Sequence, residues 1–144
     1  MTGQEIAQPG PDGFTIPGIA KTIPLGPEGN CLANSKLLTR KYPEILRYQE
    51  GVLVMSFGGA LRTSVRHAWN IGPNREIIDT TNRTEPFLGL EITYHYIPDG
   101  SEHEAERQAV AAVIGEPGPF EDDPERDGDR DAAAWLEEAC HSDL

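Results

Sequence analysis

Basic residues are scarce in this chain of 144 residues, which holds 12 Lys and Arg against 24 Asp and Glu and carries a formal net charge of -12. Binding to nucleic acid phosphates or to an anionic membrane surface needs clustered Lys and Arg. The charge balance therefore predicts neither nucleic acid nor a membrane as a partner. The excess acid lies at one end, because 15 acids and three bases stand from Asp99 onward, whereas residues 1–98 carry nine of each.

Long apolar runs and cysteines are also few. No stretch approaches the roughly 18 apolar residues of a membrane-spanning helix, and the first ten residues, MTGQEIAQPG, lack the basic and apolar regions of a signal peptide. The two cysteines, Cys31 and Cys140, allow at most one intramolecular disulfide, and nothing in the sequence indicates an oxidising compartment. We expect a soluble, cytoplasmic protein with free thiols.

Glycine and proline are abundant, and the 15 glycines and 12 prolines predict much loop and a small core. The length suits one domain. We expect a Gly/Pro-rich arm over residues 1–25, which wraps on the domain or is partly disordered and holds at most a short element near Phe14–Ile16 or Ile19–Ile23. The core domain follows over residues 26–114. Residues 115–144 are predicted to form an acidic linker, too polar to order itself, and a short helix capped by Asp131.

Within the core domain the hydrophobic period changes from helical to extended. A helix is predicted from Cys31 to about Lys41, with Asn30 as its N-cap and its end at Tyr42-Pro43, because the residue before a proline leaves the helical region. Alternating segments then predict four strands of an antiparallel sheet, at residues 51–57, 65–71, 76–79 and 90–97. Residues 101–104 have the spacing of a capping box and predict a helix through about residue 114. The fold class is therefore α+β, with a helix carrying the cysteine packed on a small antiparallel sheet and with C-terminal helices.

Cys31, His67 and Asp79 are the residues with a mechanistic reason to occur together. A thiol is nucleophilic as the thiolate, which the positive end of a helix and a neighbouring imidazolium stabilise. Cys31 is predicted at a helix start, His67 in a strand, and Asp79 at the end of the next strand, where its carboxylate can orient the imidazole ring. Each residue alone has a structural interpretation, since lone cysteines are usually buried small side chains, strand histidines are usually structural, and Asp before Thr-Thr commonly forms a turn.

Four segments carry a resemblance to a known superfamily: Cys31-Leu32-Ala33-Asn34-Ser35, Tyr48-Gln49-Glu50-Gly51, His67-Ala68-Trp69-Asn70 and Ile77-Ile78-Asp79-Thr80-Thr81. In this order they resemble the transglutaminase-like branch of the papain-like cysteine enzymes, above all its small bacterial and phage members. The resemblance covers roughly residues 26–97. The leader peptidases of lasso-peptide pathways are similar too, but the Asn after the tryptophan and the Asp-Thr-Thr that follows fit the small phage and bacterial proteins better.

The resemblance implies a role for each residue. Cys31 is the nucleophile, His67 the general base and later the acid, and Asp79 the orienting carboxylate of a thiol-dependent hydrolase or acyltransferase that acts on a peptide or on a small amide or thioester and uses no cofactor. The oxyanion would be bound by the backbone N–H of Cys31 and by the side-chain amide of Asn30 or Asn34. Trp69 would shield the histidine and the aspartate, or would simply fill the core.

Other kinds of site have less support. His95 and His103 could join the central residues in a zinc site, but no short paired spacing of ligands is present. The acidic stretch at residues 121–129 lacks the ligand order of an EF-hand, and Gly58-Gly59 lacks the Lys-Ser or Lys-Thr of a phosphate-binding loop. We therefore expect no metal. The rival hypothesis is a non-catalytic binding module on the same fold, whose acidic tail binds a basic protein partner or occupies its own site as a nucleic acid mimic.

Overall fold

The computed structural model describes residues 5–27, 30–58, 61–81, 89–118, 120 and 128–140, and for residues 128–131, 139 and 140 it describes the backbone alone. The chain divides into two compact units. The first unit comprises Met1–Gln49, Ala68–Asn82 and Glu121–Leu144, and the second comprises Glu50–His67 and Arg83–Phe120. The acidic run at residues 121–127, assigned above to a linker, lies outside the described residues.

Helix α1 spans Cys31–Lys41, as predicted. Its end is fixed by the Tyr42-Pro43 pair, where the Tyr42 N–H donates the last helical hydrogen bond to the Leu38 carbonyl at 2.9 Å. Arg40 and Lys41 occupy the last turn, where positive charge complements the helix dipole. Asn30 precedes the helix as expected, but in the part of the chain that the structure describes its side chain makes no capping hydrogen bond.

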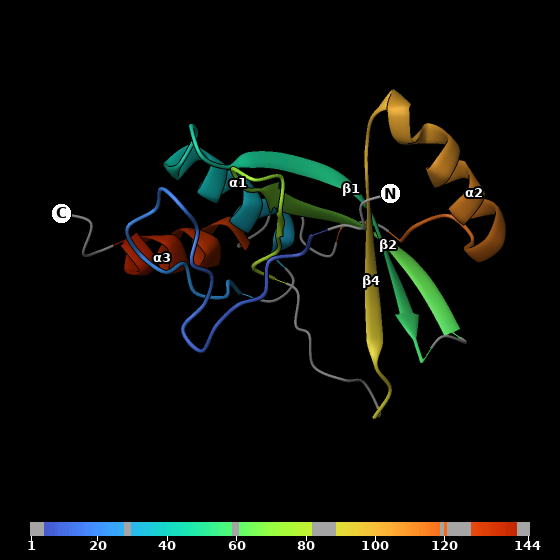
Figure 1. The fold of residues 1–144 in the computed structure, drawn as a ribbon, viewed down its shortest axis with the longest axis horizontal. Helices are drawn as coiled ribbons and strands as arrows, with labels where there is room; N and C mark the ends of the chain where they lie inside the picture. Colours follow the sequence, from blue (N-terminus) through green and yellow to red (C-terminus); the bar gives the residue numbers. More distant parts are fainter. Residues whose placement is uncertain are drawn as a thin grey trace. The chain divides into compact units, whose positions relative to one another are not determined.

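The predicted four-stranded antiparallel sheet is present, with strand order β3-β2-β1-β4 (Figure 1). The strands are β1 (Arg47–Phe57), β2 (Leu61–Ile71), β3 (Ile77–Ile78) and β4 (Ile92–Pro98). β1 and β2 each begin four residues before the predicted start, because their first residues are polar or exposed and give no alternating apolar signal. β3 is shorter than predicted, and Asp79 follows it directly.

The first unit holds the larger apolar core, and the Gly/Pro-rich arm supplies much of it. The arm folds back on itself through paired backbone hydrogen bonds between Phe14 and Ile23, and Ile6 forms a parallel bridge with Ile77 of β3. The buried residues of this core are Phe14, Ile16, Ile19, Ile23, Leu38, Leu46 and Ile78. The described part of the arm is therefore an ordered component of the fold.

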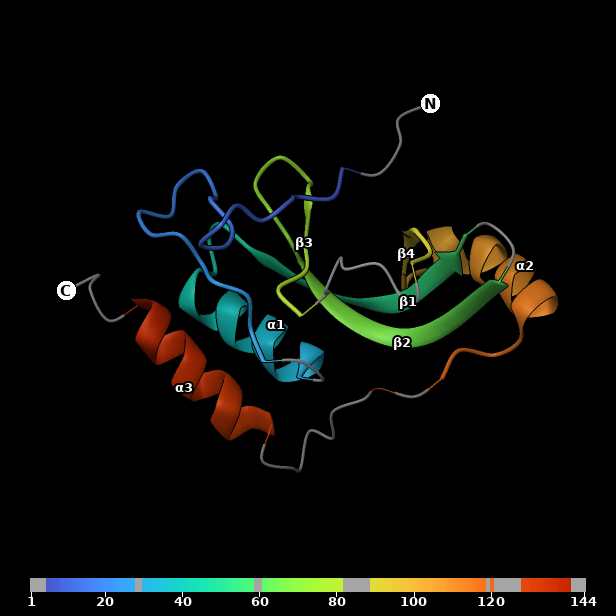
Figure 2. The same ribbon diagram turned by 90° about the horizontal axis from the view of Figure 1, so that it is seen from below.

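Helix α3 (Gly128–Cys140) belongs to the first unit and lies alongside α1 (Figure 2). It begins three residues before the predicted cap at Asp131. Ala132 is fully buried, and Trp135 and Leu136 pack against the core of the first unit. The C-terminal segment thus contributes to the core, and it is more than a solvated tail.

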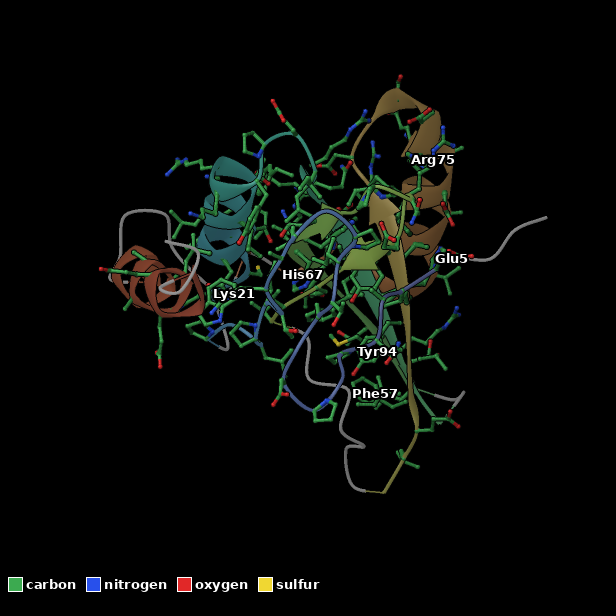
Figure 3. The ribbon with its side chains drawn as sticks, turned by 60° about the vertical axis from the view of Figure 1, so that its left-hand side comes forward. Glu5, Lys21, Phe57, His67, Arg75 and Tyr94 are labelled. Carbon is green, nitrogen blue, oxygen red and sulfur yellow. The ribbon has the colours of Figure 1, made fainter. Side chains whose placement is uncertain are left out.

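The second unit packs helix α2 on one face of the sheet. The one-turn helix η1 (Ser101–His103) leads into α2 (Glu104–Ile114), whose Val110 and Ile114 contact Val52, Val54 and Ile97. The predicted capping box is wrong, because residues 101–103 form the 3-10 turn and no side-chain cap is present at either helix start in the described region. On the opposite face Met55 pairs with Tyr94 and Phe57 with Ile92, so that Phe57 and Tyr94 lie at the same end of the sheet (Figure 3).

Among the residues that the structure describes, no helix is long and apolar enough to cross a bilayer.

Candidate active site

The first turn of α1 is enclosed on all sides. Cys31 is the first residue of the helix and is 4% exposed. All five residues of the segment from Cys31 to Ser35 are buried, whereas an amphipathic surface helix buries only one face. The partial positive charge of a helix N-terminus in such a setting acts in a medium of low dielectric, where it stabilises a thiolate or an oxyanion strongly.

Asp79 is a buried carboxyl residue, 5% exposed, that follows β3. Its Oδ1 accepts hydrogen bonds from the backbone N–H of Thr81 at 3.2 Å and from the Thr81 hydroxyl at 3.0 Å. These bonds form a local turn that holds the carboxylate in one orientation. Aspartate is rarely buried to this degree without a specific reason, and the position is therefore a functional candidate.

The short segment Gly26-Pro27, which follows the arm, connects the surroundings of these two residues. The Gly26 N–H donates to the Thr80 carbonyl at 2.8 Å, and the Asn34 Nδ2 donates to the Pro27 carbonyl at 3.2 Å. Thr80 follows Asp79, and Asn34 lies one turn after Cys31. The segment Gly26-Pro27 therefore ties the end of β3 to the first turn of α1, all within the first unit.

The approach at Gly26 is close enough to require glycine. A Cβ atom at this position would lie 2.4 Å from the Asn34 Nδ2 and 2.9 Å from its Cγ. Asn34 is fully buried and bonded to Pro27, so its amide cannot turn away. Asn34, predicted as an oxyanion donor, thus also has a structural role as a link between the helix and the Gly26-Pro27 segment.

Of the remaining predicted site residues, His67 and Trp69 lie on β2 and Asn30 lies just before α1. Trp69 is fully buried in the first unit, in the strand segment that pairs with β3 through Asn70 and Ile71. His67 is the last residue of the second unit before Ala68, and it is labelled in Figure 3. Its ring is tilted at 48° to that of Tyr96, with 6.3 Å between the centroids. Asn30 is half-buried just before the helix.

Asn70, which the sequence indicated only as part of the resemblance, has a structural role in this region. It is 1% exposed, and its Nδ2 donates to the Ser35 carbonyl at 3.0 Å and the Thr39 hydroxyl at 2.9 Å, with the Arg47 carbonyl at 3.3 Å. The side chain therefore joins β2 to α1 and to the start of β1. The sequence signal that could have indicated this role is a polar amide in a strand segment that is otherwise apolar.

A second polar cluster lies in the second unit. Arg66 makes a two-pronged ion pair with Asp99, with N–O distances of 2.8 Å and 2.7 Å, and its guanidinium lies 3.6 Å from Glu50. The hydrogen bond from Arg66 lowers the pKa of Asp99 below its ordinary value of 3.8, against the opposing effect of partial desolvation. Arg107 donates to the Pro98 and Gly100 carbonyls and so holds the turn between β4 and α2.

Among the residues that the structure describes, no three His, Cys, Asp or Glu residues lie close enough together to hold a metal ion. Comparison of the chain with protein-family profiles, with curated proteins and with solved structures finds no match.

Proposed function

We propose that the protein is a thiol-dependent hydrolase or acyltransferase that uses Cys31, His67 and Asp79 on a papain-like, transglutaminase-like core. The observation that carries the proposal is the placement of Cys31 as the first residue of a helix whose entire first turn is buried. A structural cysteine needs no such position, whereas a nucleophilic thiolate and the oxyanion formed beside it are both stabilised there.

The chemistry divides into two steps. The Cys31 thiolate attacks an acyl carbon, and the electron pair of the carbonyl moves to oxygen, where the backbone N–H of Cys31 and the side-chain amide of Asn30 or Asn34 are the proposed donors. Collapse of this intermediate breaks the bond to the leaving amine or thiol, which takes a proton from the His67 imidazolium. Water or an amine then attacks the thioester, gives its proton to His67, and releases the thiolate of Cys31.

Asp79 supports the proposal through its burial and its fixed orientation. A carboxylate held by the Thr81 backbone and hydroxyl cannot rotate freely, as the orienting member of a triad requires. The link through Gly26-Pro27 ties the residue after Asp79 to the helix turn that carries Cys31. His67 enters the proposal through its place on β2, two residues before Trp69.

The deciding experiment is the pH dependence of the alkylation of Cys31 by iodoacetamide, followed peptide by peptide with mass spectrometry. Restricted access of the reagent lowers the alkylation rate by the same factor at both pH values, so this factor cancels in the ratio of the two rates. A thiol with an ordinary pKa of about 8.5 reacts roughly 150-fold faster at about pH 8.5 than at about pH 6. We expect a ratio below about tenfold for Cys31, because an imidazole-paired thiolate persists at the lower pH.

Matched variants make the result specific. His67→Gln should raise the ratio toward that of a simple thiol, whereas His103→Gln should leave it unchanged, and N-acetylcysteine amide gives the reference value. An activated ester such as p-nitrophenyl acetate should then acetylate Cys31, and release by added amine rather than by water would identify an acyltransferase. A ratio for Cys31 equal to the reference, insensitive to His67, refutes the proposal and favours the rival hypothesis of a non-catalytic binding module.

A further inference from the structure

The outer edge of β2 in the second unit is occupied by a segment that follows α2. Gly118 lies beside Val65 in a parallel bridge. The Gly118 N–H donates to the Ser64 carbonyl at 3.0 Å, and the Arg66 N–H donates to the Gly118 carbonyl at 2.7 Å. The segment runs next to β2 in both ribbon views (Figures 1 and 2). Gly118 therefore forms with the strand the two hydrogen bonds that an added parallel strand would form at this point.

An aromatic side chain adds to this contact. Phe120 lies under the Arg66 guanidinium, 5.4 Å from the ring centroid. Because Asp99 holds Arg66 through both of its oxygens, the guanidinium is a fixed flat surface on which a ring can stack. The two backbone bonds and the ring contact together make a recognition unit of three residues in length.

A cavity of about 290 Å³ opens beside this segment. One wall comes from β1 and β2 through Val52, Ser64 and Arg66, another comes from α2, and the third is the segment itself through Gly115, Glu116 and Pro117. Two of the three walls are therefore formed without the segment. A side chain of another peptide could fill the space if the segment left.

The segment has little reason to adopt this position by itself. Residues 115–120 read Gly-Glu-Pro-Gly-Pro-Phe, a composition with no helical or strand propensity and one large apolar side chain. Its order must then come from β2, whose exposed edge would otherwise present unpaired N–H and C=O groups.

We propose that the edge of β2 at Ser64–Arg66 is a binding site for an extended peptide, and that the chain after α2 occupies it as an internal ligand through Gly118 and Phe120. The ligand class is a polypeptide that offers one backbone N–H and C=O pair to β2 and an aromatic ring two residues later to Arg66. At the paired position a Cβ atom would lie 3.8 Å from the Val65 Cγ1 and 3.9 Å from the Ser64 carbonyl oxygen, so alanine fits there as well as glycine. This inference goes beyond the proposed thiol chemistry and does not depend on it.

Two substitutions at one position test the proposal. Gly118→Pro removes the N–H that bonds to Ser64 and places a ring against that carbonyl, whereas Gly118→Ala keeps the bond and makes only ordinary contacts. The probe is a fluorescein-labelled peptide with the sequence of residues 115–120, and binding is measured by fluorescence anisotropy with the full-length chain. The internal segment competes at a high effective concentration in the wild type, so Gly118→Pro should bind the peptide at least about tenfold more tightly than the wild type or Gly118→Ala.

Further readouts make the outcome decisive. The Arg66 amide should exchange with deuterium at least about tenfold faster in Gly118→Pro than in Gly118→Ala, and a labelled peptide with alanine in place of phenylalanine should bind about two- to fivefold more weakly. Circular dichroism and the urea midpoint establish that both variants fold. Three results in folded Gly118→Pro would each overturn the proposal: a peptide affinity equal to that of the wild type, unchanged protection of the Arg66 amide, or self-association without peptide binding. If Gly118→Pro does not fold, Phe120→Ala replaces it, with weaker competition and tighter peptide binding than the wild type as the required result.

Discussion

Replacement of Asn70 by alanine should destabilise the protein by about 2–3 kcal/mol. The amide nitrogen has two hydrogens, which fit the Ser35 carbonyl and the Thr39 hydroxyl, so the bond to the Arg47 carbonyl at 3.3 Å is a shared one. Two buried hydrogen bonds contribute about 1 kcal/mol each, and the lost side-chain volume adds a cavity cost. The Oδ1 atom, buried without a hydrogen-bond partner among the described residues, disappears too, which offsets part of the loss.

Urea unfolding followed by circular dichroism measures this change, and the melting temperature should fall by about 6–10 °C for a chain of this length. Thr39→Val removes the hydroxyl that accepts from Asn70 and donates to the Ser35 carbonyl at 2.9 Å. The double-mutant cycle of Asn70→Ala and Thr39→Val should therefore show a coupling of about 1 kcal/mol. Asn74→Ala, in an exposed turn, is the matched control and should change stability by less than about 0.5 kcal/mol.

The reasoning fails if Asn70→Ala costs no more than the Asn74 control, or if the cycle shows no coupling. Either result would mean that the amide of Asn70 does not hold β2 against α1.

Two further substitutions test the packing and the electrostatics. Gly26→Ala should cost about 1–3 kcal/mol, because the new Cβ would press on the buried Asn34 amide, while Gly10→Ala, whose Cβ would lie 3.7 Å from its nearest neighbour, should be neutral in the same urea titration. Asp99→Asn should lower stability by less than about 1 kcal/mol at neutral pH, since the ion pair with Arg66 is partly exposed. The folded pKa of Asp99 is lowered, so this contribution is complete above the ordinary value of 3.8 and is lost as the pH falls through the folded value. A stability difference that persists in acid would contradict the assignment.

The sequence predicted the elements whose signals are local. Helix α1 was predicted with its observed bounds because Tyr42-Pro43 ends it and leucines mark its inner side. The four strands were predicted, but the first four residues of β1 and β2 were missed, because hydrogen bonding to a neighbouring strand holds them while their side chains are polar or exposed. The 3-10 turn at Ser101 replaced the predicted capping box for a different reason, because a local motif competes with the geometry of the connection from β4.

The missed features depend on contacts between distant segments. The sequence left open whether the arm wraps on the domain or is partly disordered, because its apolar residues, such as Phe14 and Ile23, stand among glycines and prolines and show no regular period; the structure places them in the core. The segment around Gly118 was predicted as an unordered linker because its composition lacks the means to order itself, and the edge of β2 supplies that order. Asn70 acts through partners 23 to 35 residues away.

Substitution of Asp79 by asparagine distinguishes the structural from the functional interpretation of the candidate site. Its Oδ1 accepts from the Thr81 N–H and hydroxyl, and an amide oxygen can accept the same two bonds. Asp79→Asn should therefore keep the turn, and the free energy of unfolding should change by no more than about 1 kcal/mol at neutral pH. A neutral amide cannot stabilise an imidazolium as a carboxylate does, so the ratio of Cys31 alkylation rates between about pH 8.5 and about pH 6 should rise toward the simple-thiol value of roughly 150. A carboxylate whose role is only to hold the turn predicts an equally stable variant with an unchanged ratio, and an unchanged ratio in folded Asp79→Asn would refute the assignment of Asp79 to a triad.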